Sequence, residues 1–260
     1  MSKKSLLHKI SDALMNKKHT TAIILAAGSG ERFSQSAGAL SGMKKQYVPV
    51  LGVPVLLRTV RVFEESDFIN DIVVVTAEDD VAFCRELLEG EITKLRCVIP
   101  GGATRQESAK AGLEAIDPKS EYIAIHDGAR CLVTVDIIEK TLKCAYEKGA
   151  AAAAEKAVDT VKYGSESGVI EKTIDREHVW LMKTPQIFLA NMYRAGVYTA
   201  ERDGAAVTDD CMLVERIGFK VHAVDCGHEN IKLTYATDKI IAEAILTARE
   251  EAEQTEEANK

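Results

Sequence analysis

The sequence is poor in aromatic residues (5%), contains a single tryptophan and lacks any long uninterrupted apolar run. A helix needs roughly 18 apolar residues to cross a bilayer, and a signal peptide needs an apolar centre followed by small residues at a cleavage site. Neither pattern occurs. Positive charge is also in deficit, since the formal net charge is −7. These absences argue against integral membrane association and against non-specific nucleic-acid binding, so any basic site must be local and suited to a small anion.

Paired cysteines are lacking as well. The six cysteines are scattered and form no C-x-x-C motif, the spacing typical of zinc and redox sites. A chain of 260 residues is long enough for one large α/β domain or two small ones. Scattered cysteines in such a chain are typical of a reduced cytosolic protein. We therefore predict a cytoplasmic protein whose thiols are free and mostly buried: Cys84, Cys97, Cys131, Cys144, Cys211 and Cys226.

What the sequence does contain is an alternation of short β-rich runs with helical runs. This alternation predicts βαβ units and a Rossmann-like, doubly wound, mostly parallel sheet. Ligands in such sheets bind beyond the carboxyl ends of the strands, so functional residues are expected just after each strand. The predicted strands are 22–27, 72–77, 96–99, 122–126, 151–158 and 220–225, and the predicted helices are 55–65, 81–88, 106–116, 135–148 and 211–217.

One internal segment interrupts the alternation. Residues 158–163 and 169–174 are β-type runs joined by the Gly/Ser loop "GSESG". This pattern predicts a β-hairpin arm inserted at about 158–176. An isolated two-stranded hairpin is marginal in water, so the arm must pack either on its own domain or on another subunit.

The two ends of the chain differ from the α/β domain, which we place at 20–248. Residues 240–250 indicate a helix that gives way to a solvated acidic tail at 249–260. The extension at 1–19 is basic and mildly amphipathic, and we expect a frayed segment or a packing helix there rather than a membrane-surface helix. Its apolar residues at helical spacing are Leu6, Leu7, Ile10, Ala13 and Leu14.

The first predicted strand ends in a Gly-Ser-Gly turn at 28–30, within "TAIILAAGSGERF". Glycines there can turn backbone N–H groups inward as a nest for phosphate oxygens, although an ordinary turn is about equally compatible with the pattern. The turn is not the G-x-G-x-x-G of dinucleotide folds, because Phe33 occupies the third glycine position, nor is it a P-loop. Arg32 follows the turn and Lys45 comes soon after, which makes a triphosphate clamp plausible.

Three other strand ends carry groups compatible with phosphate. "HDGAR" places Asp127 where a carboxylate could hold Mg²⁺ against phosphates, although Asp-Gly is also a common turn. "PGGATRQES" offers two glycines and Ser108, or simply a helix N-terminus capped by Thr104. "GHENIKLT" brings Lys232 to a strand end. Four such ends on one sheet favour a phosphate-binding site over four unrelated loops.

Together these motifs resemble one family: the cytidylyltransferases that make 4-diphosphocytidyl-2-C-methyl-D-erythritol in non-mevalonate isoprenoid biosynthesis. The match runs from about Thr20 to Ile245 in "LAAGSGERF", "KKQY", "GGATRQES", "HDGAR", "AVDTVK", "TPQIF", "TDD" and "ENIKLT". The first motif is shared with many sugar nucleotidyltransferases, whereas "HDGAR" with "DTVK", "TPQ" and "NIKLT" is far more specific. The resemblance implies a nucleotidyltransferase-type fold and an enzyme that joins CTP to 2-C-methyl-D-erythritol 4-phosphate and releases pyrophosphate.

The resemblance also implies roles for individual residues. Arg32, Lys45 and Lys232 would act in catalysis, with Asp127 as the ligand of Mg²⁺ or another divalent cation. The residues expected to hold CTP are Ala26, Ala27, Gly28, Gly30, Gly102 and Ser108. Those expected to hold the methylerythritol phosphate are Arg130, Thr160, Arg176, Thr184 and Lys232. In the resembled family the arm interlocks two subunits across a two-fold axis, which implies a homodimer with shared sites.

Several positions depart from the family's usual pattern. Lys44 stands where a proline usually precedes the KQY motif, and the loop "SQSAGALSGMK" is longer than usual. Ala103 replaces a common acidic residue, Cys131 replaces a proline, and "KLTYATD" lacks a proline near its end. None of these changes removes an acidic or basic residue given a chemical role. Two alternatives remain open here: a ribitol-5-phosphate cytidylyltransferase, and a regulatory module that binds CTP without turnover.

Overall fold

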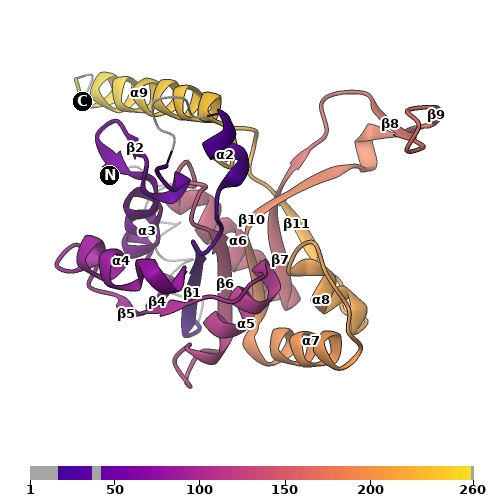
Figure 1. Ribbon diagram of the computed structural model, residues 1–260, viewed down its shortest axis with the longest axis horizontal. Coiled ribbons are helices and arrows are strands. Elements are labelled where there is room, and N and C mark those ends of the chain that lie inside the picture. Colours follow the sequence, from indigo (N-terminus) through magenta and orange to yellow (C-terminus); the bar gives the residue numbers. More distant parts are fainter. Residues whose placement is uncertain (1–16, 37–41, 259–260) are drawn as a thin grey trace, which may run out of the picture.

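The computed structural model describes residues 17–36 and 42–258 and is built on one seven-stranded sheet (Figure 1). The expected helical pattern at 6–14 lies outside the described residues. The strands run across the sheet in the order β11-β7-β10-β6-β1-β4-β5. Their bounds are β1 Thr20–Leu25, β4 Asp71–Thr76, β5 Leu95–Pro100, β6 Tyr122–Asp127, β7 Ala150–Lys156, β10 Trp180–Leu189 and β11 His222–Asp225.

The sheet is mostly parallel, as predicted. β1 pairs in parallel with β4 and β6, β4 with β5, and β11 with β7. The exception is β10, which lies antiparallel between β6 and β7. The sequence analysis placed no strand at β10, because Lys183-Thr184-Pro185 interrupts its apolar run, and the pairing with β7 shifts register there.

Helices cover both faces of the sheet. α3 (Val55–Glu65), α4 (Val81–Leu88) and α6 (Val135–Lys148) pack on one face, where side chains such as Ile24 and Val74 are fully buried. α5 (Arg105–Glu114), α7 (Ala190–Arg202) and α8 (Cys211–Arg216) lie on the other, against Ile23 and Val73. Adjacent strand residues therefore point to opposite faces, and each fully buried Ile or Val stabilises the fold by ~1.5–3 kcal/mol.

α7 was not predicted from the sequence, although Tyr193, Val197 and Ala200 have helical spacing and are buried. Gly196 in its middle weakens the helical pattern. The structure explains this glycine, because a Cβ there would lie 2.6 Å from the carbonyl oxygen of Leu213 in α8. Close packing of α7 on α8 thus requires a residue that local propensity disfavours.

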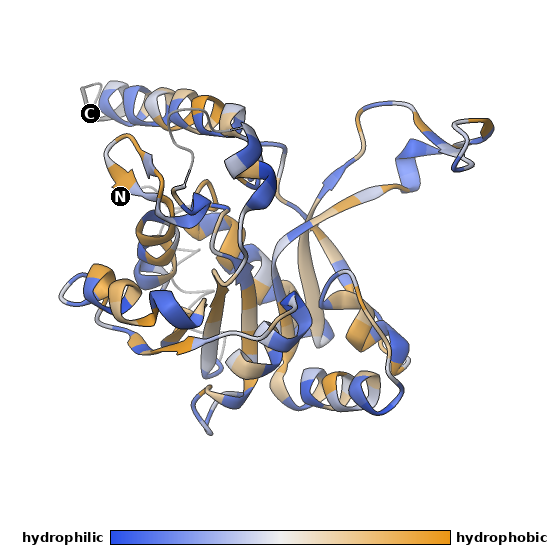
Figure 2. Cartoon of the chain, in the orientation of Figure 1, coloured by the Kyte–Doolittle hydropathy of each residue, from blue (hydrophilic) through white to orange (hydrophobic). Residues whose placement is uncertain are grey.

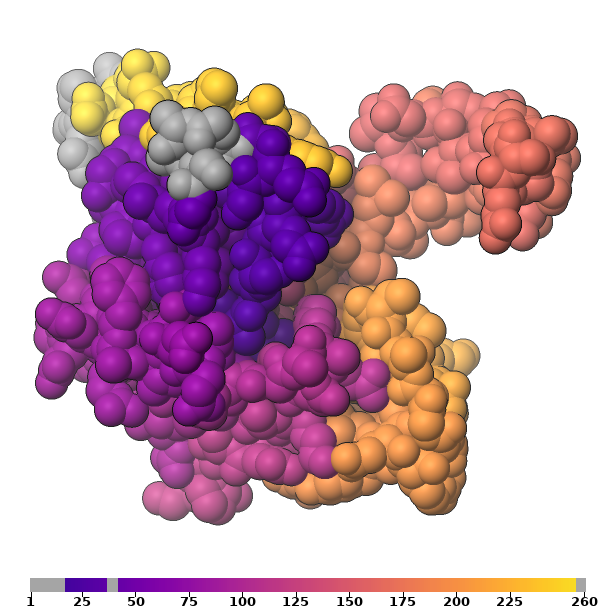
Figure 3. Space-filling model, in the orientation of Figure 1, coloured from indigo at the N-terminus to yellow at the C-terminus, as the bar shows by residue number. Residues whose placement is uncertain are grey.

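The predicted hairpin arm is present as β8 (Val161–Gly164) and β9 (Ile170–Ile174), and it projects away from the sheet (Figure 1). Its large apolar side chains are exposed, with 72% of Val158 and 62% of Val169 accessible to solvent. Open space separates the arm from the body on the face shown in Figure 3. The alternative that the arm packs on its own domain is therefore wrong.

The C-terminal helix α9 (Ala236–Ala258) is longer than predicted. Residues 251–255 are exposed, as expected of an acidic tail, but they continue the helix instead of ending it. Figure 2 shows that the far part of α9 is mainly hydrophilic. Within the described ranges, no helix is both long and apolar enough to cross a membrane.

All six cysteines are free, as predicted. Cys84, Cys131 and Cys211 are buried, whereas the other three are only half-buried, so the prediction of mostly buried thiols holds for half of them.

The remaining elements are short. They are α2 (Glu31–Ser36), β2 (Pro49–Val50), β3 (Val53–Pro54) and the 3-10 turns η2 (Lys45–Tyr47), η3 (Glu78–Asp80) and η4 (Arg176–His178).

Candidate active site

A cavity of about 390 Å³ lies at the carboxyl ends of β1 and β6, where the sequence places its phosphate-compatible motifs. All four predicted strand ends contribute to it. The predicted site residues that line it are Ala26, Ala27, Gly28, Lys45, Gly102, Ser108, Asp127 and Lys232. Arg130 and Thr184 lie behind these residues, Gly30 packs against Lys45, and Arg32 is exposed on α2.

The floor of the cavity forms where the loop after β1 meets the loop after β5. Gly101 allows this close approach, because a Cβ there would lie 2.6 Å from Ser108 Oγ and 2.8 Å from the Ala27 side chain. Ser108 is buried, and its hydroxyl donates to the Thr104 carbonyl oxygen at 2.9 Å. Thr104 does cap α5, together with Glu107 in a capping box, so the helix-cap reading is confirmed while Gly102 and Ser108 still face the cavity.

Lys45 projects into the cavity from η2. The preceding glycine turn packs against it: Gly30 adopts φ +72°, and a Cβ there would lie 3.4 Å from Lys45 Cγ. The next residue, Gln46, is buried and donates from Nε2 to the Ala26 carbonyl oxygen at 2.9 Å, which ties η2 to the end of β1. Burial, reinforced by the positive charges of Lys232, Arg32 and Arg130, lowers the pKa of Lys45 to about 8. At pH 7 Lys45 is still mostly protonated, so it presents positive charge to an anion in the cavity.

Asp127, at the end of β6, is the single carboxylate among the described residues that line the cavity. Its Oδ2 lies 2.9 Å from Lys232 Nζ and 3.4 Å from Arg130 Nε, and its Oδ1 lies 3.5 Å from Arg105 Nε. Burial by itself would raise the pKa of Asp127, but Lys232, Arg105 and Arg130 outweigh burial and hold that pKa well below its usual range. The site thus surrounds one anion with three cations.

Thr184 and His126 support Asp127 from behind. The Thr184 hydroxyl oxygen accepts from the Asp127 backbone N–H at 3.1 Å, so its own proton is free for His126 Nδ1 at 3.0 Å. His126 Nε2 then carries the ring proton and faces the Arg130 carbonyl oxygen at 3.3 Å. Burial lowers the pKa of His126 to about 3, so this histidine is a neutral, hydrogen-bonded core residue.

Arg130 is held in turn by the segment that carries Lys232. Its Nη1 donates to the Asn230 carbonyl oxygen at 2.9 Å, and Asn230 Nδ2 donates to the Thr184 carbonyl oxygen at 2.9 Å. Asn230 is completely buried. These bonds join "HDGAR", "TPQ" and "NIKLT", which are distant in the sequence, into one layer behind the cavity.

Sequence reasoning missed a buried ion pair beside Asp127. Arg105 Nη1 lies 2.6 Å from Asp210 Oδ2, and the Tyr193 hydroxyl donates to Asp210 Oδ1 at 2.6 Å. The Asp210 backbone N–H donates to Gln186 Oε1 at 3.0 Å. Asp210 belongs to the "TDD" motif and Arg105 to "GGATRQES", but a single sequence does not reveal that α5 and α8 bring the two together.

Two predicted site residues lie away from the cavity. Thr160 and Arg176 are exposed on the arm, where Arg176 Nη1 donates to the Val158 carbonyl oxygen at 2.5 Å. Neither lines the cavity of its own chain. A role for them in substrate binding would require the arm of a second subunit.

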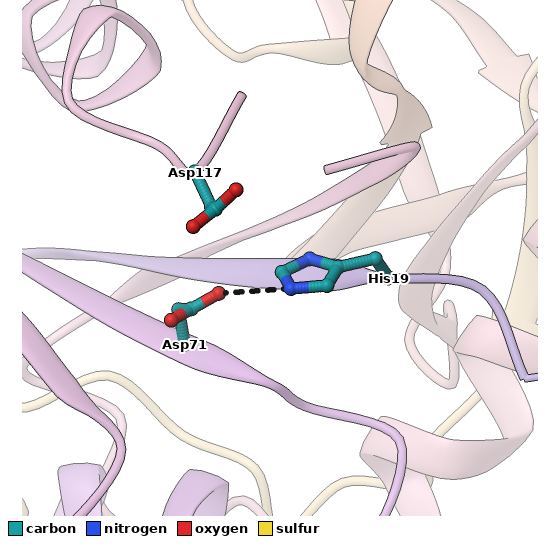
Figure 4. A group of neighbouring side chains, drawn as sticks. All are labelled: His19, Asp71 and Asp117. Atoms are coloured by element: carbon teal, nitrogen blue, oxygen red, sulfur yellow. Dashed lines mark ion pairs between the residues drawn. The ribbon is translucent and has the colours of Figure 1, made fainter. Parts of the chain in front are cut away.

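A second group of side chains that could bind a metal lies at the amino ends of β1 and β4, away from the cavity. The donor atoms of His19, Asp71 and Asp117 are within 4.8 Å of one another (Figure 4). His19 Nε2 lies 3.3 Å from Asp71 Oδ2. Asp117 already accepts from Arg96 Nη1 at 2.9 Å and from the Lys119 backbone N–H at 2.8 Å. Since His19 and Asp71 already contact each other and Asp117 accepts from Arg96 and Lys119, we assign no metal there.

Comparison with known proteins agrees with this geometry. The family model for 2-C-methyl-D-erythritol 4-phosphate cytidylyltransferase matches residues 20–248. Proteins of that name from Alkaliphilus metalliredigens and Geobacter metallireducens are 36% and 40% identical to this chain, covering 91% and 86% of it and 96% of each relative. The crystal structure of 4-diphosphocytidyl-2C-methyl-D-erythritol synthase from Anaerococcus prevotii superposes with a TM-score of 0.80 at 31% identity, covering 90% of this chain and 99% of that one. The chain therefore belongs to the 2-C-methyl-D-erythritol 4-phosphate cytidylyltransferase family and is a nucleotidyltransferase.

Proposed function

We propose that the cavity joins CTP to 2-C-methyl-D-erythritol 4-phosphate, giving 4-diphosphocytidyl-2-C-methyl-D-erythritol and pyrophosphate for isoprenoid precursor synthesis. The observation that carries this proposal is the cationic surround of Asp127. Lys232 and Arg130 contact its carboxylate directly, and the Lys45 ammonium adds further positive charge nearby. Such an excess of fixed positive charge is complementary to two phosphorylated substrates.

The triphosphate of CTP would lie between the glycine turn and Lys45. The turn offers backbone N–H groups, and Arg32 lies in the first turn of α2, the helix that follows it. The nucleoside would rest on the floor formed by Ala26, Ala27, Gly102 and Ser108, all but one of which present only backbone or a methyl group. A shallow floor of small residues leaves room for a flat base and its ribose.

The reaction needs no general base. The phosphate monoester of the second substrate has a pKa near 6, so it is mostly dianionic at neutral pH. Its oxygen can attack the α-phosphorus of CTP in line, forming one P–O bond while the bond to the pyrophosphate breaks. Catalysis then consists of aligning two anions and neutralising the charge that they share. Arg32, Lys45 and Lys232 would supply that neutralisation. Arg130 would hold the incoming phosphate with Lys232, and Thr184 would support this layer through its hydrogen bonds to Asp127 and His126.

Asp127 fits the expected divalent cation. Mg²⁺ prefers one or two carboxylates together with phosphate oxygens, and Asp127 offers a buried, fully ionised carboxylate beside the triphosphate position. Bound there, Mg²⁺ would neutralise phosphate charge. Because three cations already surround Asp127, we expect appreciable metal affinity only when CTP contributes its phosphate oxygens.

The arm supports a homodimer with shared active sites. Exposed apolar residues on a projecting hairpin are stabilised when a second copy covers them, and a two-fold interface would bury both arms at once. Thr160 and Arg176 would then reach the partner's substrate.

The free thiols are compatible with the reducing cytoplasm, where we propose that the reaction takes place.

Pyrophosphate release tests this function. We expect rapid release from CTP and Mg²⁺ with 2-C-methyl-D-erythritol 4-phosphate, and little with ribitol 5-phosphate in a parallel assay. Preference for ribitol 5-phosphate would establish the alternative polyol. CTP binding without release from either substrate would indicate a non-catalytic module.

A further inference from the structure

Lys44, which immediately precedes the cavity-lining Lys45, faces a different part of the molecule. Its Nζ lies 2.7 Å and 2.6 Å from the two carboxylate oxygens of Asp80, at the end of η3. The Asp80 side chain is only 15% exposed. One ammonium group therefore spans both oxygens of a largely buried carboxylate, and joins the η2 segment to the turn that follows β4.

Tyr47, at the other end of η2, makes a second set of contacts with the same region. Its hydroxyl lies 2.9 Å from Thr76 Oγ1 at the end of β4. Its ring meets Phe83 of α4 edge-on, with centroids 5.0 Å apart. Lys45 is thus carried by a short turn that is fastened on both sides, by Lys44 before it and by Tyr47 after it.

We propose that Lys44 is a positioning residue whose ion pair with Asp80 fixes the turn that presents Lys45 to the triphosphate. This inference rests on the proposed function, because it assumes that CTP occupies the cavity. Lys44 itself does not line the cavity, so in this proposal it acts on CTP through the position of Lys45.

The backbone of Lys44 supports a conformational role. It adopts φ −68° and ψ 132°, and this φ is close to the value near −65° that a proline ring fixes. Among the described residues, none accepts a hydrogen bond from the Lys44 backbone N–H. A proline at this position could therefore hold the same φ without an ion pair.

The rival explanation is that Lys44 acts directly as one more positive charge for CTP. The two explanations predict opposite effects at Asp80. If Lys44 acts through the ion pair, Asp80→Asn loosens the turn and weakens CTP binding. If Lys44 acts by charge, Asp80→Asn removes a competing carboxylate and strengthens CTP binding.

The experiment measures CTP affinity by calorimetry and kcat and KM by pyrophosphate release, for Lys44→Met, Asp80→Asn and the double variant. We expect each single change to weaken CTP binding about two- to fivefold, the range of a partly exposed ion pair. The double variant should be no weaker than either single one, because all three remove the same interaction. Lys44→Arg should keep the pair and behave like the wild type.

Lys44→Pro gives the decisive readout. It should bind CTP like the wild type, and should remain so when combined with Asp80→Asn, because the ring replaces the ion pair. Lys140→Met and Asp136→Asn serve as matched controls, since this exposed pair on α6 has a 2.6 Å contact and lies outside the cavity. Both controls should leave CTP affinity unchanged.

Three outcomes would overturn the inference: tighter CTP binding by Asp80→Asn, additive losses in the double variant, or wild-type affinity in both single variants with wild-type unfolding temperatures. Failure of the wild-type protein to bind CTP at all would instead overturn the proposed function. The two failures are therefore distinguishable.

Discussion

The cavity and the arm differ in how their side chains are satisfied within one chain. Around the cavity, Asp127, Thr184 and His126 are buried and hydrogen-bonded to one another. On the arm, Val158 and Val169 are exposed apolar side chains with no covering element among the described residues. Polar groups that are buried with hydrogen-bond partners form a preorganised site. An apolar hairpin exposed to water still lacks the surface that would cover it. On the proposed function, a single chain would bind nucleotide and a second chain would complete the substrate site.

The largest effect on turnover is expected for Asp127→Asn, which changes the buried site. A neutral amide is a much poorer ligand for a hard cation, so Mg²⁺-dependent turnover should be abolished. CTP binding without Mg²⁺ should persist or improve, because a negative charge is removed from beside the triphosphate. Turnover against Mg²⁺ concentration and calorimetry without Mg²⁺ separate these effects. An unchanged Mg²⁺ requirement would show that Asp127 is only a turn residue.

Lys45→Ala and Arg32→Ala should each lower kcat about 10²- to 10³-fold, the usual loss when a transition-state contact is removed. The fold should remain intact, since Arg32 is exposed and Lys45 is only half-buried. Steady-state kinetics and circular dichroism together check this expectation, with Lys140→Ala on the exposed face of α6 as the control. Near-normal turnover in either variant would contradict the triphosphate clamp.

Deleting the arm tests whether the cavity depends on a second chain. Replacing it with a short Gly-Ser turn should yield a monomer that still binds CTP but turns over poorly, as judged by sedimentation and pyrophosphate release. An active monomer would show that the cavity is complete by itself.

Mixing two inactive variants tests shared sites directly. In a heterodimer of Lys45→Ala and Arg176→Ala subunits, one of the two sites keeps both residues, so random exchange of an equal mixture should restore about a quarter of wild-type activity. Two variants of the same residue, Lys45→Ala and Lys45→Met, form the control and should recover none. No recovery in the first mixture after demonstrated exchange would place Arg176 within its own subunit's site.

The same division separates what the sequence could predict from what it could not. Strands β1, β4 and β6, and the residues just after them, were predictable because apolar runs ending in glycine or acidic residues have a local physical meaning. The Arg105–Asp210 pair was not predictable, because it depends on how α5 and α8 pack. Helix α7 was missed because Gly196 lowers local propensity for the sake of a tertiary contact. Local patterns thus located the cavity, and packing between distant segments supplied its supporting layer.

The smallest expected effect concerns protons taken up by the cavity when CTP binds. Burial lowers the pKa of Lys45 to about 8, so in the free protein its ammonium is mostly formed at pH 7, half formed near pH 8 and largely lost above that pH. Among its charged neighbours, Lys232, Arg32 and Arg130 oppose this charge, and Asp127 favours it. A bound triphosphate would favour the charged form strongly and raise the pKa.

By linkage, binding at pH 8 should therefore take up about half a proton, and the Kd for CTP should rise above pH 8 by up to about tenfold per pH unit. The effect of Lys45 on folding stability has the opposite direction. Its pKa in the folded protein lies below the unfolded value of 10.5, so burial of the ammonium destabilises the fold below pH 8. This destabilisation is relieved as the pH rises from 8 towards 10.5. Calorimetry in buffers of different ionisation enthalpy measures the proton uptake. Lys45→Arg, which stays charged throughout, should abolish both the uptake and the pH dependence of Kd. The same proton uptake in Lys45→Arg would assign the titration to another group and remove Lys45 from direct contact with the triphosphate.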